Sequence, residues 1–585
     1  MNRERTYIGV SASFGRSSIA IVSSRGDIQF AHGSQRVFDR NGNPTHSECL
    51  AKLAERYCGS ETDIVLALAV NEDSPDACAP AIGLRKASGR GATLREVTGK
   101  RCELPPMMRS AEPGSLYSRQ CQLVILSLTE VAFEYELERV RGRMQGILEK
   151  RRYPTHLAHA AAACFAGPYE EALCAVVDGE GGQSSKCYLY RDGALFEISP
   201  TRRPKHEGSL GALMRDVCNA SGLPVVRGEH WKAMALAKHG TFDANIYAFL
   251  NEYVSADGLC LGAVDHTEML TIYKKLDSVS RRPEEPILKA ADLVCTAQSI
   301  FATTLLALLK NLHATKASQN LVFTGECALN PTANGTILER TQFKSLYIPS
   351  APDLGGQAVG AAFLACQEDG NIITRHSQLQ TPYLGFEFEA DKFEVAAKGL
   401  STCKMEHCKE STSEKAAKLL AAGMTVGWVS ERAEFACRAL GNRSVFVDPR
   451  QVNPSEITGR LSSEFVWPFG ISILHEYGSE YFDGYQTSPY GERALKYRPK
   501  AARRIPSIVQ TDGRVQVQSV RRDWNERLYD LIWAFYSMTG IPLVINLDFG
   551  LPDGSPAETP EEVFTMFSAC RIDAIFVDDL LIIKQ

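Results

Sequence analysis

The order of strand-like and helix-like segments limits most strongly what this chain can fold into. The N-terminus predicts a hairpin of two strands, Tyr7–Ser11 and Ser18–Val22, followed by a third strand at Ile64–Val70. Farther along, apolar spacing and good helix formers predict helices at His156–Phe165 and Ala291–His313. This mixture of hairpins and helices indicates an α/β fold that is not a clean strand–helix–strand repeat. No internal repeat is evident in the sequence.

The pattern breaks around residues 375–395, which predicts a boundary between two domains. The other predicted segments are strands at Ala172–Val177, Lys186–Tyr190, Leu321–Phe323, Thr425–Val429, Ile508–Val509, Val515–Val520, Leu543–Asn546, Ala574–Val577 and Leu580–Ile583, and helices at Glu48–Tyr57, Leu123–Leu148, Ser413–Ala422 and Asn525–Met538. A chain of 585 residues has room for two to four domains with separate cores. We therefore expect domains at residues 1–385 and 386–585.

Composition and charge exclude several classes of protein. The net charge of −5 gives no strong field for nucleic acid or anionic lipid. No run of about 18 apolar residues is present, and the N-terminus becomes polar too early for a signal peptide. We therefore expect a soluble, cytoplasmic protein that binds neither nucleic acid nor membrane. The 17 cysteines are odd in number and lack a CxxC pair, so buried thiols are expected rather than disulfides.

Histidines near carboxylates or thiols form two candidate metal sites. His156 and His159 share one face of a predicted helix, and Asp178 ends an apolar strand at the glycine-rich loop DGEGGQSS. This pattern indicates an ion or phosphate site, and the alternative is one buried structural histidine beside one surface histidine. The segment Cys403–Cys408 offers two thiols and a histidine, one ligand fewer than a structural zinc site takes.

The glycine-rich segment Pro349–Ala362 is a second candidate site. Its small residues follow Asp353 and permit close approach by a ligand or by a neighbouring helix. Together with upstream residues, the segment predicts one wall of a nucleotide site. The residues of this wall are Gly325, Asn330, Gly355 and Gly356.

Three arginines mark a third candidate site. Arg432, Arg438 and Arg443 lie beside a small-residue turn that ends at Ser444. Their planar guanidinium groups suit recognition of phosphate oxygens in pairs. The alternative is a solvated basic surface with incidental spacing.

Six motifs occur in order along almost the whole chain. They are HLAHAAAACF, AVVDGEG, GEHWKAMALAKHG (residues 228–240), TGECALNPTANG, PDLGGQAVGAA and RAEFACRALGNRSVFVDPR (residues 432–450). They resemble, in the same order, HHLSHAASAF, TVDGxGE, GEYKVMGLAPYG, GGVALNCxANG, GDxGxAxGAA and RMEFGPRALGNRSILADPR of the NodU/CmcH carbamoyltransferases. By this ordered set the chain is identified as a member of that family.

The resemblance implies an N-terminal actin-like (ASKHA) domain and a C-terminal YrdC-like domain. In the family, the C-terminal domain makes carbamoyl adenylate from ATP, with Mg²⁺, and carbamoyl phosphate, and it releases pyrophosphate. The N-terminal domain, with an iron-type divalent ion (Fe²⁺), passes the carbamoyl group to a hydroxyl of a small molecule.

The resemblance also implies roles for particular residues. His159, Asp178 and Asp353 match three metal-ligand positions, and His156 is the candidate substitute for the fourth, which falls on Thr155. Glu229 and Lys232 fall in the segment that borders the transfer site, where the alternative is a surface salt bridge. The candidate nucleotide-binding residues are Arg432, Arg438, Arg443, Ser444, Gly325, Asn330, Gly355 and Gly356.

Several family positions are substituted in this chain. The family's His and Asp near Phe14-Gly15-Arg16 are missing, and NTSFN becomes NLDFG at residues 546–550. The basic run KxRExFRPFAPS becomes LSSEFVWPFGIS, and HxDGTxRxQTV becomes QTDGRVQVQSV. The altered positions are Leu461, Ser463, Trp467, Gln510 and Gln516, with Arg460 and Arg514 as nearby candidates for compensation.

Three functions follow as hypotheses. The first is an O-carbamoyltransferase of natural-product biosynthesis that acts on a small-molecule hydroxyl. The second is a catalytically impaired paralogue that partners an active enzyme, since cations that would meet two phosphorylated substrates are lost. The third keeps nucleotide binding but uses a different donor. A homodimer and a heteromer with a related protein are both compatible with the sequence.

Overall fold

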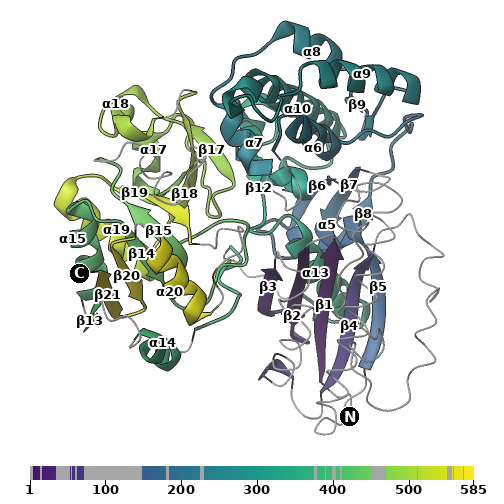
Figure 1. Cartoon of the computed structure of the whole chain (residues 1–585). Helices are drawn as coiled ribbons and strands as arrows, with labels where there is room; N and C mark the ends of the chain where they lie inside the picture. The colour runs from purple at the N-terminus through teal and green to yellow at the C-terminus, as the bar shows by residue number, and fades with distance from the viewer. Residues whose placement is uncertain are drawn as a thin grey trace, which may run out of the picture.

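The computed structural model describes most of the chain and arranges it in three bodies (Figure 1). The described residues are 4–13, 16–34, 53, 56–58, 62–70, 148–179, 184–223, 230–373, 379–388, 390–397, 403–408, 411–450, 469–509, 512–549, 557, 559–570 and 572–584. Two five-stranded sheets and the helices between them form the first body. A helical lobe caps the second sheet, and a nine-stranded sheet forms a separate body beside them.

The two five-stranded sheets repeat one topology. The first contains β1 (Arg5–Ser13), β2 (Arg16–Val22), β3 (Ile28–Ser34), β4 (Asp63–Val70) and β5 (Leu148–Pro154) in the order β3-β2-β1-β4-β5. The second contains β6 (Glu171–Val177), β7 (Ser185–Arg191), β8 (Ala194–Glu197), β11 (Asn320–Thr324) and β12 (Ser345–Tyr347) in the order β8-β7-β6-β11-β12. In each sheet three strands form antiparallel hairpins, and two later strands add in parallel. This duplication is the actin-like arrangement that the resemblance implies.

Two helices rich in alanine and glycine fill the space between these sheets. α5 (Thr155–Phe165) packs on β6 and β11, and α13 (Leu354–Glu368) packs on β1, β2 and β4. Each helix follows the last strand of one sheet and covers the other sheet. The helices touch where a Cβ at Gly360 would lie 1.7 Å from the Ala158 carbonyl oxygen, so only glycine allows this approach. Their small side chains therefore set the separation of the two sheets.

The helical lobe is inserted between β8 and β11. It contains α6 (Leu210–Ala220), α7 (His230–Ala237), α8 (Ala244–Leu250), the hairpin β9 (Ser255–Asp257) and β10 (Cys260–Gly262), α9 (His266–Ser278) and α10 (Ala291–His313). Among the described residues, one stretch, Ile287–His313, is long and apolar enough to cross a membrane. Here its apolar side chains form the core of the lobe. Short helices η3 (Glu326–Leu329), α11 (Pro331–Asn334) and α12 (Ile337–Arg340) follow β11.

The C-terminal sheet has its own apolar core. Its strands, in spatial order, are β13 (Cys403–His407), β21 (Leu580–Lys584), β20 (Ala574–Val577), β14 (Val426–Val429), β15 (Arg443–Val447), β19 (Leu543–Asp548), β16 (Gly470–Leu474), β18 (Arg514–Val520) and β17 (Arg493–Lys496). The helices that accompany them are α14 (Ala390–Ala397), α15 (Thr412–Ala421), α17 (Gly478–Tyr481), α18 (Pro499–Ala502), α19 (Glu526–Thr539) and α20 (Pro560–Ala569). Among the described residues, the buried members of this core run from Phe393 onward, and the partly buried Phe388 packs against them.

Most predicted segments are confirmed, and two predictions need correction. Ile508–Val509 is no strand, because the turn η6 (Pro506–Ile508) begins at a proline that has no N–H for a ladder. Leu148 begins β5 instead of ending a helix, and the rest of the predicted helix 123–148 lies outside the described residues. In the described part of the chain no zinc site forms at Cys403–Cys408, where His407 Nε2 lies 3.5 Å from Glu394 Oε1.

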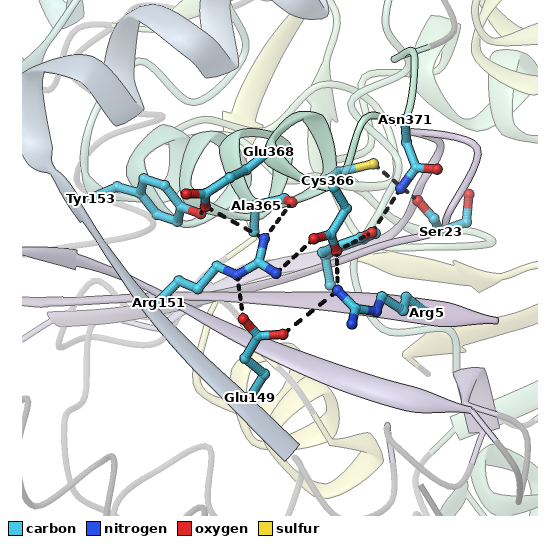
Figure 2. Close-up of polar contacts among 11 residues, drawn as sticks. Arg5, Ser23, Glu149, Arg151, Tyr153, Ala365, Cys366, Glu368 and Asn371 are labelled. Atoms are coloured by element: carbon cyan, nitrogen blue, oxygen red, sulfur yellow. Dashed lines mark hydrogen bonds and ion pairs between the residues drawn. The ribbon is translucent and has the colours of Figure 1, made fainter. Parts of the chain in front are cut away.

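A charged cluster fastens the end of α13 to the first sheet (Figure 2). Asp369, directly after the helix, accepts hydrogen bonds from Arg5 at 2.7 Å, Arg151 at 2.6 Å and the Tyr7 hydroxyl at 2.8 Å. Arg151 also donates to the Ala365 carbonyl at 3.0 Å, which places a cation at the helix C-terminus. Burial opposes ionisation of Asp369, but the two guanidinium groups hold its pKa below the ordinary value.

We predict that Asp369→Asn lowers the free energy of unfolding at pH 7 by about 2 kcal/mol, because charge-assisted hydrogen bonds are lost. The folded-state pKa is depressed, so this contribution is present above about pH 4 and is lost as the pH falls through the folded value. Urea unfolding at several pH values measures it. The exposed pair partner Asp523 is the control, and Asp523→Asn should change stability little.

We also predict that Gly360→Ala lowers stability by about 1–3 kcal/mol, because the new methyl group forces α5 and α13 apart. Thermal unfolding checks this. Gly33→Ala is the matched control, since its Cβ would meet nothing closer than 4.0 Å. Equal melting temperatures for the two variants would contradict the role of the contact.

Candidate active site

A buried polar pair lies where α5 passes the end of β6. His159 Nε2 is 3.3 Å from Asp178 Oδ2, and neither side chain is more than a tenth exposed. The other Asp178 oxygen accepts from the backbone N–H groups of Gly179 at 2.9 Å and Glu326 at 3.4 Å. Burial opposes its ionisation, but these bonds and the His159 and His156 charges lower the pKa of Asp178 to about 2. Asp178 is therefore held as a carboxylate.

Gln357 joins this pair, and the sequence did not single it out. Its Nε2 lies 2.8 Å from His159 Nε2, and its Oε1 accepts from the Ser11 hydroxyl at 2.6 Å. The cluster therefore links β1, α13, α5 and the end of β6. A polar residue one helical turn after Asp353, in an otherwise small and apolar helix, is the signal that could have revealed it.

Asp353 is turned toward the C-terminal body. Its Oδ1 caps α13 by accepting from Gly355 N at 3.2 Å, and its Oδ2 accepts from the thiol of Cys437 at 3.2 Å. Cys437 is exposed and was not considered in the sequence. It stands where the motif RMEFGPRALGNRS has proline, which is the signal that could have found it.

The implied metal ion does not fit the residues as they lie. All four predicted ligands, His156, His159, Asp178 and Asp353, are described and buried. Nevertheless, in the described part of the chain no three His, Cys, Asp or Glu side chains converge to hold a metal ion. His159 and Asp178 come together as predicted, whereas Asp353 is engaged elsewhere. We therefore derive no chemical step from a metal ion at this centre.

All four residues of the predicted nucleotide wall lie in the described part of the chain, and their role in binding a nucleotide stays a prediction. Gly325, with φ of 95°, donates its N–H to Pro352 O at 2.9 Å. Asn330 is buried, caps α11, and shares two reciprocal amide bonds of 3.0 Å with Gln298. Gly355 and Gly356 form the first turn of α13, where a Cβ at Gly355 would meet the Phe435 ring at 3.0 Å.

A half-buried carboxylate organises the loop that carries the arginines. Glu434 Oε1 accepts from three backbone N–H groups, those of Leu440 at 2.9 Å, Asn442 at 2.7 Å and Arg443 at 2.9 Å. A single side chain therefore folds this loop, residues 432–443, around itself. The sequence did not single out Glu434.

Two of the three arginines hold backbone in this structure. Arg443 is buried, lies 4.3 Å from the centre of the Phe388 ring, and has a pKa lowered by burial to about 10. It donates to the carbonyls of Ser430, Asn442, Phe386 and Glu431. Arg432 donates to the carbonyls of Gly385, Gln29 and Leu384. Ser444 is buried and accepts from Gly441 N at 3.1 Å.

Arg438 lies at the junction of the two halves of the chain. It donates to Gln516 Oε1 at 2.6 Å and to the Leu329 carbonyl, after β11, at 3.0 Å. Burial lowers the pKa of Arg438. Arg514, the nearby candidate for compensation, lies 3.7 Å from Glu339 Oε2 and donates to the Ala494 carbonyl at 3.5 Å.

Most of the remaining predicted positions lie outside the described residues. Lys232 lies half-buried on α7, but Glu229 is outside the described residues. The positions Arg460, Leu461, Ser463, Trp467 and Gln510 are outside them as well. The roles predicted for these residues stay predictions.

We predict that Glu434→Ala lowers the free energy of unfolding by about 3 kcal/mol, because three N–H groups lose their acceptor. Glu434→Gln keeps an acceptor oxygen and should lose about 1 kcal/mol. Urea unfolding compares the two variants. Equal losses would show that the carboxylate oxygen does not organise the loop.

Comparison with known proteins matches both halves of one family. The carbamoyltransferase N-terminus model matches residues 125–363, and the carbamoyltransferase C-terminus model matches residues 417–584. Together they span more than half of the chain.

Similar proteins extend along most of the sequence. An uncharacterised protein of Synechocystis sp. is 27% identical over 73% of this chain and 75% of its own length. Nodulation protein NolNO of Sinorhizobium fredii is 27% identical over 74% of this chain and 63% of its own length. Among solved structures, component A of (R)-2-hydroxyglutaryl-CoA dehydratase of Acidaminococcus fermentans is 13% identical over 63% of this chain and 99% of its own, with a TM-score of 0.32. With both family regions matched in order, the chain belongs to the carbamoyltransferase family.

Proposed function

We propose that this protein is an O-carbamoyltransferase that uses ATP and carbamoyl phosphate to carbamoylate a hydroxyl of a small molecule in natural-product biosynthesis. The observation that carries the proposal is the ordered match to both regions of the family. In this scheme the C-terminal body forms carbamoyl adenylate and releases pyrophosphate. The acceptor hydroxyl then attacks the carbamoyl carbon, AMP leaves, and the hydroxyl proton passes to a base.

Contacts between the two halves support this division of labour. Arg438 bonds the Leu329 carbonyl, Cys437 bonds Asp353, and the Asn334 side chain donates to the Glu492 carbonyl at 2.9 Å. The arginine loop therefore lies against the end of β11 and the start of α13. A reactive adenylate formed at this loop would have a short path to an acceptor at the N-terminal centre. A cation at Arg438 would stabilise the adenylate phosphate as it leaves.

A specific observation favours a second candidate, a catalytically impaired paralogue that partners an active enzyme. Arg432 and Arg443 use their donors on backbone carbonyls, and the partner of Arg438 is the neutral Gln516. In this reading the loop keeps its family sequence because it builds the fold.

Pyrophosphate release distinguishes the two candidates. The purified chain is incubated with ATP and Mg²⁺, with and without carbamoyl phosphate, and each condition is repeated with Fe²⁺. Release that requires carbamoyl phosphate supports the transferase. No release from folded protein in any condition favours the paralogue.

We predict that Arg438→Ala lowers kcat/KM for this pyrophosphate release by about 100-fold, since a lost charge-assisted bond changes the barrier by roughly 3 kcal/mol. Arg522→Ala, in the exposed turn before α19, is the control and should keep full activity. Unchanged kcat/KM in Arg438→Ala would remove Arg438 from the site.

A further inference from the structure

The geometry points to an N-terminal centre that holds no resident metal ion. A closed hydrogen-bonded cluster of Ser11, Gln357, His159 and Asp178 stands where the family has its iron-type ion. This inference is independent of the proposed function, because it concerns ion binding and not carbamoyl transfer.

The Nε2 atom of the His159 imidazole already has partners within the cluster. A histidine binds a metal ion through a ring nitrogen whose lone pair is available. His159 Nε2 faces Gln357 Nε2 at 2.8 Å and Asp178 Oδ2 at 3.3 Å. Gln357 is itself fixed at its other end by the Ser11 hydroxyl at 2.6 Å, so it cannot turn away without breaking a second buried bond.

The other ring nitrogen of His159, Nδ1, does not provide a metal site either. His159 Nδ1 is buried, and the structure gives it no hydrogen-bond partner among the described residues. An ion there would need further ligands, and no three His, Cys, Asp or Glu side chains of the described chain converge. One nitrogen alone does not form a protein metal site.

The spacing of residues at the start of α13 also differs from that of the family motif. The family motif GDxGxAxGAA has five residues between its aspartate and the final Gly-Ala-Ala. Here six residues separate Asp353 from Gly360, so Asp353 lies one residue farther than in the family motif from the glycine that packs against α5. Asp353 then caps the helix at Gly355 N and accepts from Cys437. The carboxylate faces the C-terminal loop.

The histidine that would pair with His159 in the family is absent from this chain. The family's first histidine, four residues before His159, is Thr155 in this chain. Thr155 carries no ring nitrogen, and His156, although on the same helix face as His159, does not complete a group of three ligands among the described residues. The missing imidazole at Thr155, the extra residue after Asp353 and the hydrogen bond between Gln357 and His159 together leave no complete ligand set among the described residues.

Direct ion binding tests the inference. Wild-type protein is dialysed to equilibrium against Fe²⁺ under anaerobic conditions, and separately against Mn²⁺ and Zn²⁺, and bound metal is measured by mass spectrometry. His159→Ala is treated in parallel. We expect both proteins to bind equally, well below one ion per chain at this centre.

One ion per chain in the wild type that is lost in His159→Ala would overturn the inference. An ion retained by both proteins lies elsewhere and leaves it standing. Thermal unfolding gives a second readout: metal should not raise the wild-type melting temperature by an amount that His159→Ala abolishes.

A restoring variant tests the cause. Thr155→His and Gln357→Ala together restore the family's pair of histidines and release His159 Nε2, and this double variant should bind one ion that the wild type does not. Adding His159→Ala should abolish the gain. A folded double variant without bound metal would contradict the assignment of these two positions as the reason. Pyrophosphate release is measured separately, so failure of the proposed function stays distinguishable.

Discussion

The contact between α5 and α13 is the constraint on which the N-terminal half depends. The backbones meet so closely that Gly360 faces the Ala158 carbonyl with no room for a side chain, and Gly9 of β1 approaches the Ala358 carbonyl in the same way. This close packing explains the run of alanines and glycines in both helices. It also brings His159 and Gln357, one from each helix, to hydrogen-bonding distance.

The arginine loop, residues 432–443, shows how a motif that the chain shares with its family can have a structural role. A buried guanidinium loses much solvation, and Arg443 recovers it through four carbonyl contacts and the Phe388 ring. The Glu434 carboxylate accepts hydrogen bonds from three backbone N–H groups and so replaces the water that these groups lose on folding. These contacts hold the loop in a form that places Arg438 and Cys437 against the other half of the chain.

Elements with strong periodicity could be predicted from the sequence, and relations across the fold could not. Ala291–His313 and Ala574–Val577 were located to the residue, because apolar spacing and β-branched runs are local signals. The duplicated topology was implied by the family resemblance and not by any repeat in the letters, because two sheets can share strand order without sharing sequence. His159 and Asp178 were paired correctly through the family motif. Gln357 and Glu434 were missed because their partners are backbone groups or side chains that only the fold brings near.

The exchange of α5 and α13 between the sheets has a consequence for synthesis of the chain. Each sheet is covered by the helix that belongs to the other half. The face of β1, β2 and β4 that α13 covers therefore lacks these contacts until Leu354–Glu368 has been synthesised. Neither of the two sheets completes its packing from its own half of the chain alone.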